Sequence, residues 1–225
     1  KNASSNQEGA SHFEMALKYL EKEEVSPTRD KRELELQAPL GQVVIALHGW
    51  ASRKAGLVHE RAFALTRNMD APPQLFQIMF GLGANRGLGK KFLEGLSIAK
   101  QMSQYADATD DKAGRSIAHR LYGNFLFWLP DYDLANTHFR KALTVYDELE
   151  SPRLIEEYGH DPKALSLAYL AWLYTCIGFP DQGLTFARKA VAHAQLLKFP
   201  YVISHVHLFV ATVFQILNDP KNTKF

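Results

Sequence analysis

Residues 115–147 contain a spacing that few folds can accommodate. Gly123 precedes Ala135 by twelve positions, and a proline-containing break lies between them. Leu126 follows the glycine and Phe139 follows the alanine, each at helical spacing. We therefore expect two antiparallel helices that approach closely at the two small residues, with the larger side chains filling the space beside them.

The same spacing recurs along the chain in phase. Ala171 and Gly183 are twelve positions apart around another proline-containing break, and Phe80 and Phe92 have the same separation. A looser copy begins at Gly41, with two extra residues in its turn. This tandem pattern resembles the tetratricopeptide (TPR) repeat, a helix–turn–helix unit of about 34 residues.

The sequence therefore predicts an all-α fold, a TPR-like α-solenoid in which antiparallel helix hairpins stack into a right-handed superhelix. No segment alternates apolar and polar residues, as a β-strand would, over more than a few positions. We expect a single repeat domain over residues 1–225 that is a fragment of a larger protein. Its expected elements are an isolated helix at 9–23, repeats at about 30–69, 73–105, 112–148 and 162–197, and an isolated helix at 199–217.

Local signals refine this outline. Pro39 lies inside the helix expected at 30–48 and should kink it, because proline removes a backbone hydrogen bond and clashes with the preceding turn. Thr28 or Asp30 is expected to cap the start of that helix. Residues 149–161 form the longest insertion between repeats, and we expect them to form a loop.

Composition and charge exclude several classes of function. The chain has 26 basic and 24 acidic residues, so no overall field would recruit nucleic acid or a membrane. No apolar run reaches the roughly 18 residues of a membrane span, and no signal-peptide pattern opens the chain. The single cysteine, Cys176, excludes an internal disulfide and fits a reducing compartment. These features favour a cytoplasmic location.

The glycine-rich segment 81–90 resembles a nucleotide-binding loop in composition, but its residues do not match the known nucleotide-binding patterns. A Walker A loop needs glycine six positions before its lysine and a hydroxyl residue after it. Those positions hold Ala84 and Lys91, and no strand precedes the segment as a dinucleotide-binding site would require. An inter-helix turn is the better interpretation.

No catalytic or metal-binding pattern is present in the sequence. His205 and His207 are two positions apart, which places them on different faces of a helix. His48, His119 and His160 lack cysteine or carboxylate partners at ligand spacing. We therefore expect no enzymatic activity, no metal and no cofactor in this chain.

The concave face of the stacked hairpins is the remaining candidate for function, because the first helix of each hairpin lines it. The residues predicted to bind are those that the first helices turn toward this concave face: Gln77, Asn85, Arg120, Asn124, Phe127, Trp128, Trp172 and Thr175. Exposed tryptophan and arginine are typical of binding hot spots. Core packing is the alternative interpretation for the two tryptophans.

Several segments also resemble one protein family. They are residues 32–37 (RELELQ), 73–76 (PQLF) with 81–82 (GL), 158–162 (YGHDP), 164–172 (ALSLAYLAW) and 178–182 (GFPDQ). Together they resemble the C-terminal TPR region of large bacterial signalling proteins that join a class III adenylate/guanylate cyclase domain to an AAA-type ATPase domain. The resemblance covers about residues 30–217, and Pro39 departs from it. It implies a regulatory region, since neither the cyclase carboxylates nor the ATPase P-loop is present.

The expected function is therefore non-catalytic regulation. The groove would bind a protein segment, a neighbouring domain of the parent chain or a small effector. The alternative is a structural module that self-associates, as a homodimer, through the apolar faces of its uncapped end helices. The residues that would discriminate between the two are Phe13, Leu17, Leu208 and Phe209.

Overall fold

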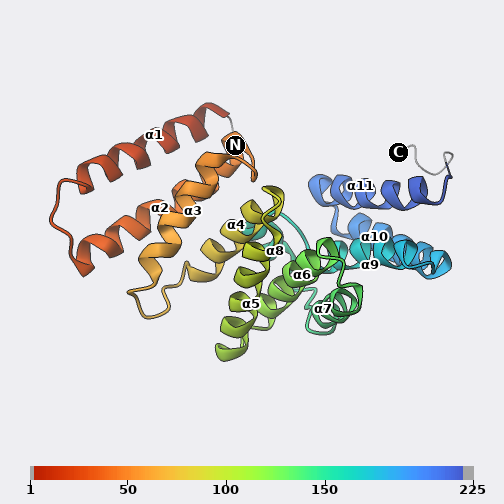
Figure 1. The fold of residues 1–225 in the computed structure, drawn as a ribbon. Coiled ribbons are helices and arrows are strands. Elements are labelled where there is room, and N and C mark those ends of the chain that lie inside the picture. Colours follow the sequence, from red (N-terminus) through yellow and green to blue (C-terminus); the bar gives the residue numbers. More distant parts are fainter. Residues whose placement is uncertain (1–2, 220–225) are drawn as a thin grey trace. The chain divides into compact units, whose positions relative to one another are not determined.

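The computed structural model describes residues 3–219, which form eleven α-helices and contain no strand (Figure 1). The all-α prediction is confirmed. The helices are α1 (Ala3–Leu20), α2 (Pro27–His48), α3 (Arg53–Thr66), α4 (Leu75–Leu88), α5 (Phe92–Ala108), α6 (Lys112–Trp128), α7 (Tyr132–Thr144), α8 (Ser151–Tyr158), α9 (Pro162–Cys176), α10 (Pro180–Leu197) and α11 (Pro200–Ile216).

The chain divides into two compact units, an N-terminal unit (Lys1–Ile98) and a C-terminal unit (Ala99–Phe225). None of the described helices combines the length and the apolar character needed to cross a membrane. We describe each unit separately.

In the N-terminal unit, helices that follow one another in sequence pack side by side: α1 with α2, α2 with α3, and α3 with α4. Leu40, Val44 and Ala55 form a buried cluster, and Phe13 and Leu17 of α1 pack against it. The apolar face of α1 is therefore partly covered by α2, although the sequence suggested an isolated helix. Helix α1 also begins earlier than predicted, at Ala3.

The start of α2 differs from the prediction. The helix begins at Pro27, and the Ser26 hydroxyl caps it by accepting a hydrogen bond from the backbone N–H of Arg29 at 3.2 Å. The expected caps, Thr28 and Asp30, lie inside the helix, because proline is well suited to the first helical position.

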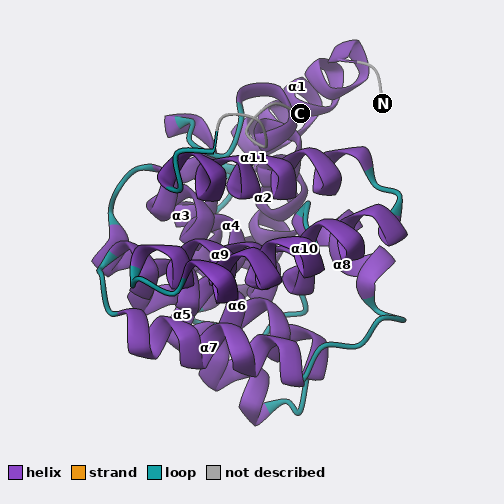
Figure 2. Cartoon of the chain, turned by 90° about the vertical axis from the view of Figure 1, so that its right-hand side faces the viewer, coloured by secondary structure: helices purple, strands orange, loops and turns teal. Residues whose placement is uncertain are grey.

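In the C-terminal unit, α6 pairs with α7 and α9 pairs with α10. The first helices of these hairpins, α6 and α9, also lie next to one another, and α9 contacts α11 as well (Figure 2). A buried cluster that includes Ala171, Ala187 and Val206 lies between α9, α10 and α11. We call α6, α9 and α11 the inner helices of this unit.

The predicted close approaches occur where the small residues lie. A Cβ added at Gly123 would be 2.8 Å from the ring of Phe139, and one added at Gly183 would be 2.8 Å from the carbonyl oxygen of Ala171. Both contacts are shorter than side chains tolerate, so each helix pair depends on glycine at its crossing point.

The prediction of a loop at 149–161 was wrong in part, because this segment contains helix α8. Leu154 and Tyr158 of this helix are buried at i, i+4 spacing, and Gly159 ends the helix in the left-handed conformation with φ 73°. A glycine at this position is a common helix stop. The insertion is therefore a packed element of the C-terminal unit.

Candidate functional site

The inner helices bring aromatic side chains together from three separate parts of the chain. We call this set the aromatic cluster: Phe127 and Trp128 of α6, Tyr169 and Trp172 of α9, and Phe209 of α11. Trp128 and Trp172 meet edge to face, with ring centroids 5.4 Å apart. The rings of Tyr169 and Phe209 are 4.6 Å apart. Such tilted and edge-to-face contacts are favourable beyond the area that they bury.

The cluster has a buried base and an exposed top. Phe127 and Tyr169 are buried, and the Tyr169 ring stacks on Phe139 of α7 with centroids 5.3 Å apart. Trp172 and Phe209 are half-buried, while Trp128 remains 43% exposed. The exposed rings are therefore held in place by packing below them, which reduces the entropy lost when a partner binds.

The Trp128 side chain also has a polar contact within the cluster. The side chains of Trp128 and Asn124 interact with the Tyr169 hydroxyl and lower its pKa, against the larger effect of burial. Burial raises the pKa of Tyr169 to about 12, so the phenol is neutral at physiological pH. What Trp128 offers to a partner is consequently mainly the face and edges of its ring.

Arg120 lies buried in the same unit and contacts His160. Arg120 Nη2 is 2.6 Å from His160 Nε2, and His160 Nδ1 is 2.8 Å from the carbonyl oxygen of Tyr158. This arrangement requires Nδ1–H to donate to the carbonyl and Nε2 to accept from the guanidinium. Burial lowers the pKa of Arg120 to about 10, and burial together with Arg120 holds the pKa of His160 well below its usual range. At neutral pH the pair is a charged arginine and a neutral histidine.

The remaining predicted residues lie elsewhere. Thr175 is buried, donates to the carbonyl oxygen of Ala171 at 2.8 Å and lies against Gly183 of α10. In the N-terminal unit, Gln77 is half-buried. The Asn85 side chain, in the same unit, donates to the carbonyl oxygens of Trp50 and Ser52 and so ties α4 to the turn between α2 and α3.

Sequence reasoning identified Phe127, Trp128 and Trp172 but missed Tyr169 and Phe209. Tyr169 precedes Trp172 by three positions and thus shares its side of the helix, which is a signal that could have been used. Phe209 was considered only as part of an uncovered end helix, whereas α11 contributes it to the same cluster.

A second polar network surrounds Asp161, which is fully buried. Its carboxylate accepts hydrogen bonds from the hydroxyls of Tyr146 and Ser151, each at 2.7 Å, from His193 at 3.1 Å and from the backbone N–H of Ala164 at 2.7 Å. Because Ser151 donates its proton to the carboxylate, this arrangement does not activate the serine as a nucleophile. It joins α8 and α10 to the start of α9.

Among the described residues, no group of three or more His, Cys, Asp or Glu side chains is arranged to hold a metal ion.

No protein-family model matches the chain, and no curated protein matches it either. Solved structures do resemble it. BtubC (BKLC) from P. vanneervenii aligns with a TM-score of 0.63 and 13% identity, covering 99% of this chain and 85% of that one. The kinesin light chain TPR-like repeats of Podosopora anserina align with a TM-score of 0.60 and 13% identity, covering 90% and 92%.

The structure of NprR in complex with its cognate peptide NprX aligns with a TM-score of 0.66 and 12% identity. The alignment covers 96% of this chain, which spans 59% of the length of NprR. At such low identity these likenesses concern the fold alone. The chain has a TPR-like helical repeat fold, as the twelve-residue spacing predicted.

Proposed function

We propose that the C-terminal unit is a recognition module that binds a protein segment on the aromatic cluster. The observation that carries this proposal is the exposure of Trp128 above a packed aromatic base. Tryptophan is enriched among the residues that dominate binding energy, particularly where its surroundings are rigid. NprR, which has a similar fold, was solved with a bound peptide, and this supports the choice of a peptide segment as the ligand.

The fuller proposal is that this binding is regulatory and that the chain has no catalytic activity. The segment would belong to a partner protein or to a neighbouring domain of a longer cytoplasmic chain. The segments 158–162 and 178–182 support a parent of the cyclase–ATPase signalling type by resemblance. A small effector that alters the occupancy of the surface is compatible with the same role.

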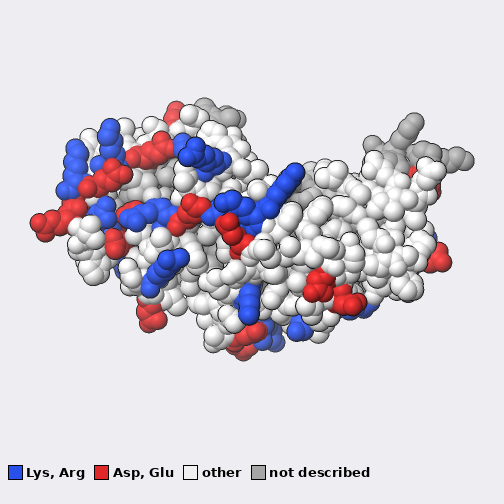
Figure 3. Space-filling view, viewed as in Figure 1, with Lys and Arg blue, Asp and Glu red and all other residues white. Residues whose placement is uncertain are grey.

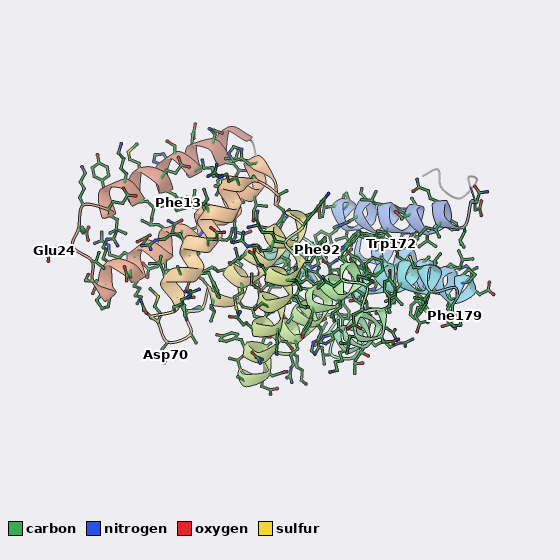
Figure 4. The ribbon with its side chains drawn as sticks, in the orientation of Figure 1. Phe13, Glu24, Asp70, Phe92, Trp172 and Phe179 are labelled. Carbon is green, nitrogen blue, oxygen red and sulfur yellow. The ribbon has the colours of Figure 1, made fainter. Side chains whose placement is uncertain are left out.

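The test is selection of binders from a randomised nonapeptide library, followed by affinity measurements on the enriched peptides. We expect Trp128→Ala to weaken binding by about tenfold or more, as loss of a hot-spot tryptophan does. Phe179→Ala is the matched control, because Phe179 is 51% exposed and lies at the turn before α10, away from Trp172 (Figure 4). Absence of enriched peptides, or equal effects of the two substitutions, would refute the proposal.

Self-association is a second candidate that one observation favours. Leu208 is 65% exposed and Tyr201 is 57% exposed on α11, a helix without charged residues. Phe13 and Leu17 pack against α2, and Phe209 belongs to the aromatic cluster, so Leu208 is the most informative position. If this function is correct, sedimentation will show a dimer that Leu208→Glu converts to a monomer. A wild-type monomer at high concentration would exclude it.

A further inference from the structure

Four side chains from α7, α9 and α10 form a patch on the side of α9 that faces away from the aromatic cluster. They are Arg140 of α7, Tyr174 of α9, and Phe186 and Lys189 of α10, and we call them the cationic patch. Tyr174 follows Trp172 by two positions, which places it roughly 200° around the helix from the tryptophan. The patch is therefore a surface separate from the aromatic cluster.

Arg140 is held in a fixed position although it is exposed. Its Nε atom donates to Oδ1 of Asn136 at 3.0 Å, and its Nη2 atom donates to the Tyr174 hydroxyl at 2.9 Å. The guanidinium carbon also lies 5.7 Å from the centroid of the Phe186 ring, an arrangement that favours a cation. Arginine has five N–H donors, so the guanidinium can donate to a further acceptor. Little side-chain entropy would be lost when an anion binds there.

Lys189 brings a second positive charge to the same ring. Its Nζ atom lies 5.7 Å from the Phe186 centroid, the distance also found for Arg140, so the two charges lie within twice that distance of each other. Phe186 in turn stacks on Tyr174, with centroids 5.3 Å apart and planes inclined by 19°. The patch thus presents two cations around a packed pair of half-buried aromatic rings.

The contacts of the two cations supply no carboxylate. Arg140 contacts neutral acceptors and a ring, and Lys189 contacts a ring. The acidic residues of the same helices, Asp133 and Asp181, lie seven and eight positions earlier, which is at least about 10 Å along a helix. Asp161 is fully buried within the polar network described above. Charged side chains are also sparse over α9 to α11 in the view of Figure 3.

The helix dipole does not explain where the two cations lie. Basic side chains interact favourably with the dipole mainly in the last turn of a helix. The last turn of α7 contains Lys141, and that of α10 contains no basic residue. Arg140 precedes this turn, and Lys189 lies eight positions before α10 ends at Leu197. Recognition of a negatively charged partner accounts for the pair more directly.

We infer that the cationic patch binds an acidic segment of a partner protein. Carboxylates of the segment accept hydrogen bonds from Arg140 and Lys189, and its apolar atoms lie against Phe186. Carboxylates two or three positions apart in an extended segment are about 7–10 Å apart, which the spacing of the two cations can accommodate. This inference concerns a second surface and does not rest on the function proposed for the aromatic cluster.

A nucleic acid fits the patch less well than an acidic protein segment does. Proteins that bind nucleic acids typically present a longer basic stripe, whereas this patch has two cations. Asp133 and Asp181 lie on the same helices and would repel an extended phosphate backbone.

The test uses nonapeptides enriched on the wild-type chain from a randomised library. We expect one class to be rich in aspartate and glutamate and to lose affinity about tenfold or more with Arg140→Gln, because a hydrogen bond to a charged group is lost. Lys189→Gln should weaken the same peptides about threefold, as for an exposed charge pair. Arg188→Gln is the matched control, because Arg188 is exposed on α10 two positions from Phe186 and hence on another side of the helix.

Synthetic peptides give a measurement that does not depend on the folding of a variant. Replacing each acidic residue with glutamine should weaken binding to the wild-type protein about tenfold. Raising the salt concentration should weaken the acidic peptides and leave the glutamine versions nearly unchanged. Equal affinity of the two versions at low salt would overturn the inference.

The outcomes also separate this inference from the function proposed for the aromatic cluster. Peptides that lose affinity with Trp128→Ala report on that cluster, and peptides that lose it with Arg140→Gln report on the patch. If no enriched peptide loses more affinity with Arg140→Gln than with Arg188→Gln, the inference is wrong, whatever the effect of Trp128→Ala. A short oligothymidine strand that binds in place of acidic peptides, and is released by Arg140→Gln, would also overturn it. Acidic peptides that depend on Arg140, without any that depend on Trp128, would support the inference and refute the proposed function.

Discussion

The ring of Phe139 lies so close to Gly123 that a Cβ at position 123 would be 2.8 Å from its Cδ1 and Cε1 atoms. This contact joins α6 to α7 at the point where the two helices cross. In the N-terminal unit, Gly41 lies against the imidazole of His59 in the same way, with a corresponding distance of 2.9 Å. In both hairpins a ring of the second helix therefore lies against a glycine of the first, with a histidine in one where the other has a phenylalanine.

Gly123→Ala should destabilise the protein although alanine is the better helix former. The added methyl group would overlap the fully buried Phe139 ring, and overpacking of this kind costs about 1–3 kcal/mol. Urea unfolding would measure the change. Gly9→Ala is the control, because no atom lies within 4 Å of its added Cβ, and it should be neutral or stabilising by up to about 1 kcal/mol. Equal effects of the two substitutions would contradict this account of the hairpin.

Asp161→Ala should be strongly destabilising. It removes the acceptor for Tyr146, Ser151 and His193 and leaves their polar groups buried without that partner, a loss on the order of 3–5 kcal/mol for a buried charged network. Asp131→Ala is the matched control: this exposed residue also caps a helix, and its loss should cost about 1 kcal/mol. A similar decrease in unfolding free energy in both variants would show that Asp161 stabilises the protein only as a helix cap.

Glu33 should contribute more to stability than a surface carboxylate does. It is buried on α2, accepts two hydrogen bonds from Arg61 of α3 and lies 3.3 Å from Arg29. We expect Glu33→Gln to lower the free energy of unfolding by about 1–3 kcal/mol, as for hydrogen bonds to charged groups. Glu23→Gln, which disrupts an exposed pair with Arg32, should change it by less than about 1 kcal/mol. Chemical denaturation in low salt would measure the loss of unfolding free energy in both variants. A larger loss for Glu23→Gln than for Glu33→Gln would contradict this prediction.

Stability should fall as the pH decreases below about 6.5. Burial lowers the pKa of His138 to about 4, and the neighbouring His119 and Lys141 add to the effect. Because this pKa is lower in the folded state, the unfolded chain binds more protons. The contribution of His138 is therefore complete above the unfolded pKa of about 6.5 and is lost as the pH falls toward 4. His160 should act in the same direction.

Unfolding free energies at pH 7.5, 6.0 and 5.0 would reveal this dependence. His138→Gln should reduce the slope, while the same substitution at His12, which is exposed on α1, should leave it unchanged. Constant stability across this range, or stability that rises as the pH falls, would contradict the prediction.

Much of the fold could be predicted because its signals are local. The helices predicted between residues 30 and 197 begin and end within a few residues of those observed, since prolines and capping residues act on the adjacent turn. The spacing from Gly123 to Ala135 indicated where two helices must approach closely, and the structure has the Phe139 ring at that point. The helix α8 was missed because its eight residues are few for a periodic pattern.

The positions of the candidate binding residues were less predictable, because the burial of a helix face depends on what packs against it. Trp128 and Thr175 were both predicted to line the concave face, yet Trp128 is exposed and Thr175 is buried against Gly183. Arg120 is buried beside His160, forty positions away in sequence. Periodicity reports which side chains share a face of one helix. The neighbours of that face, and hence whether a charge is buried or an indole is exposed, depend on contacts between distant segments that form only when the helices pack.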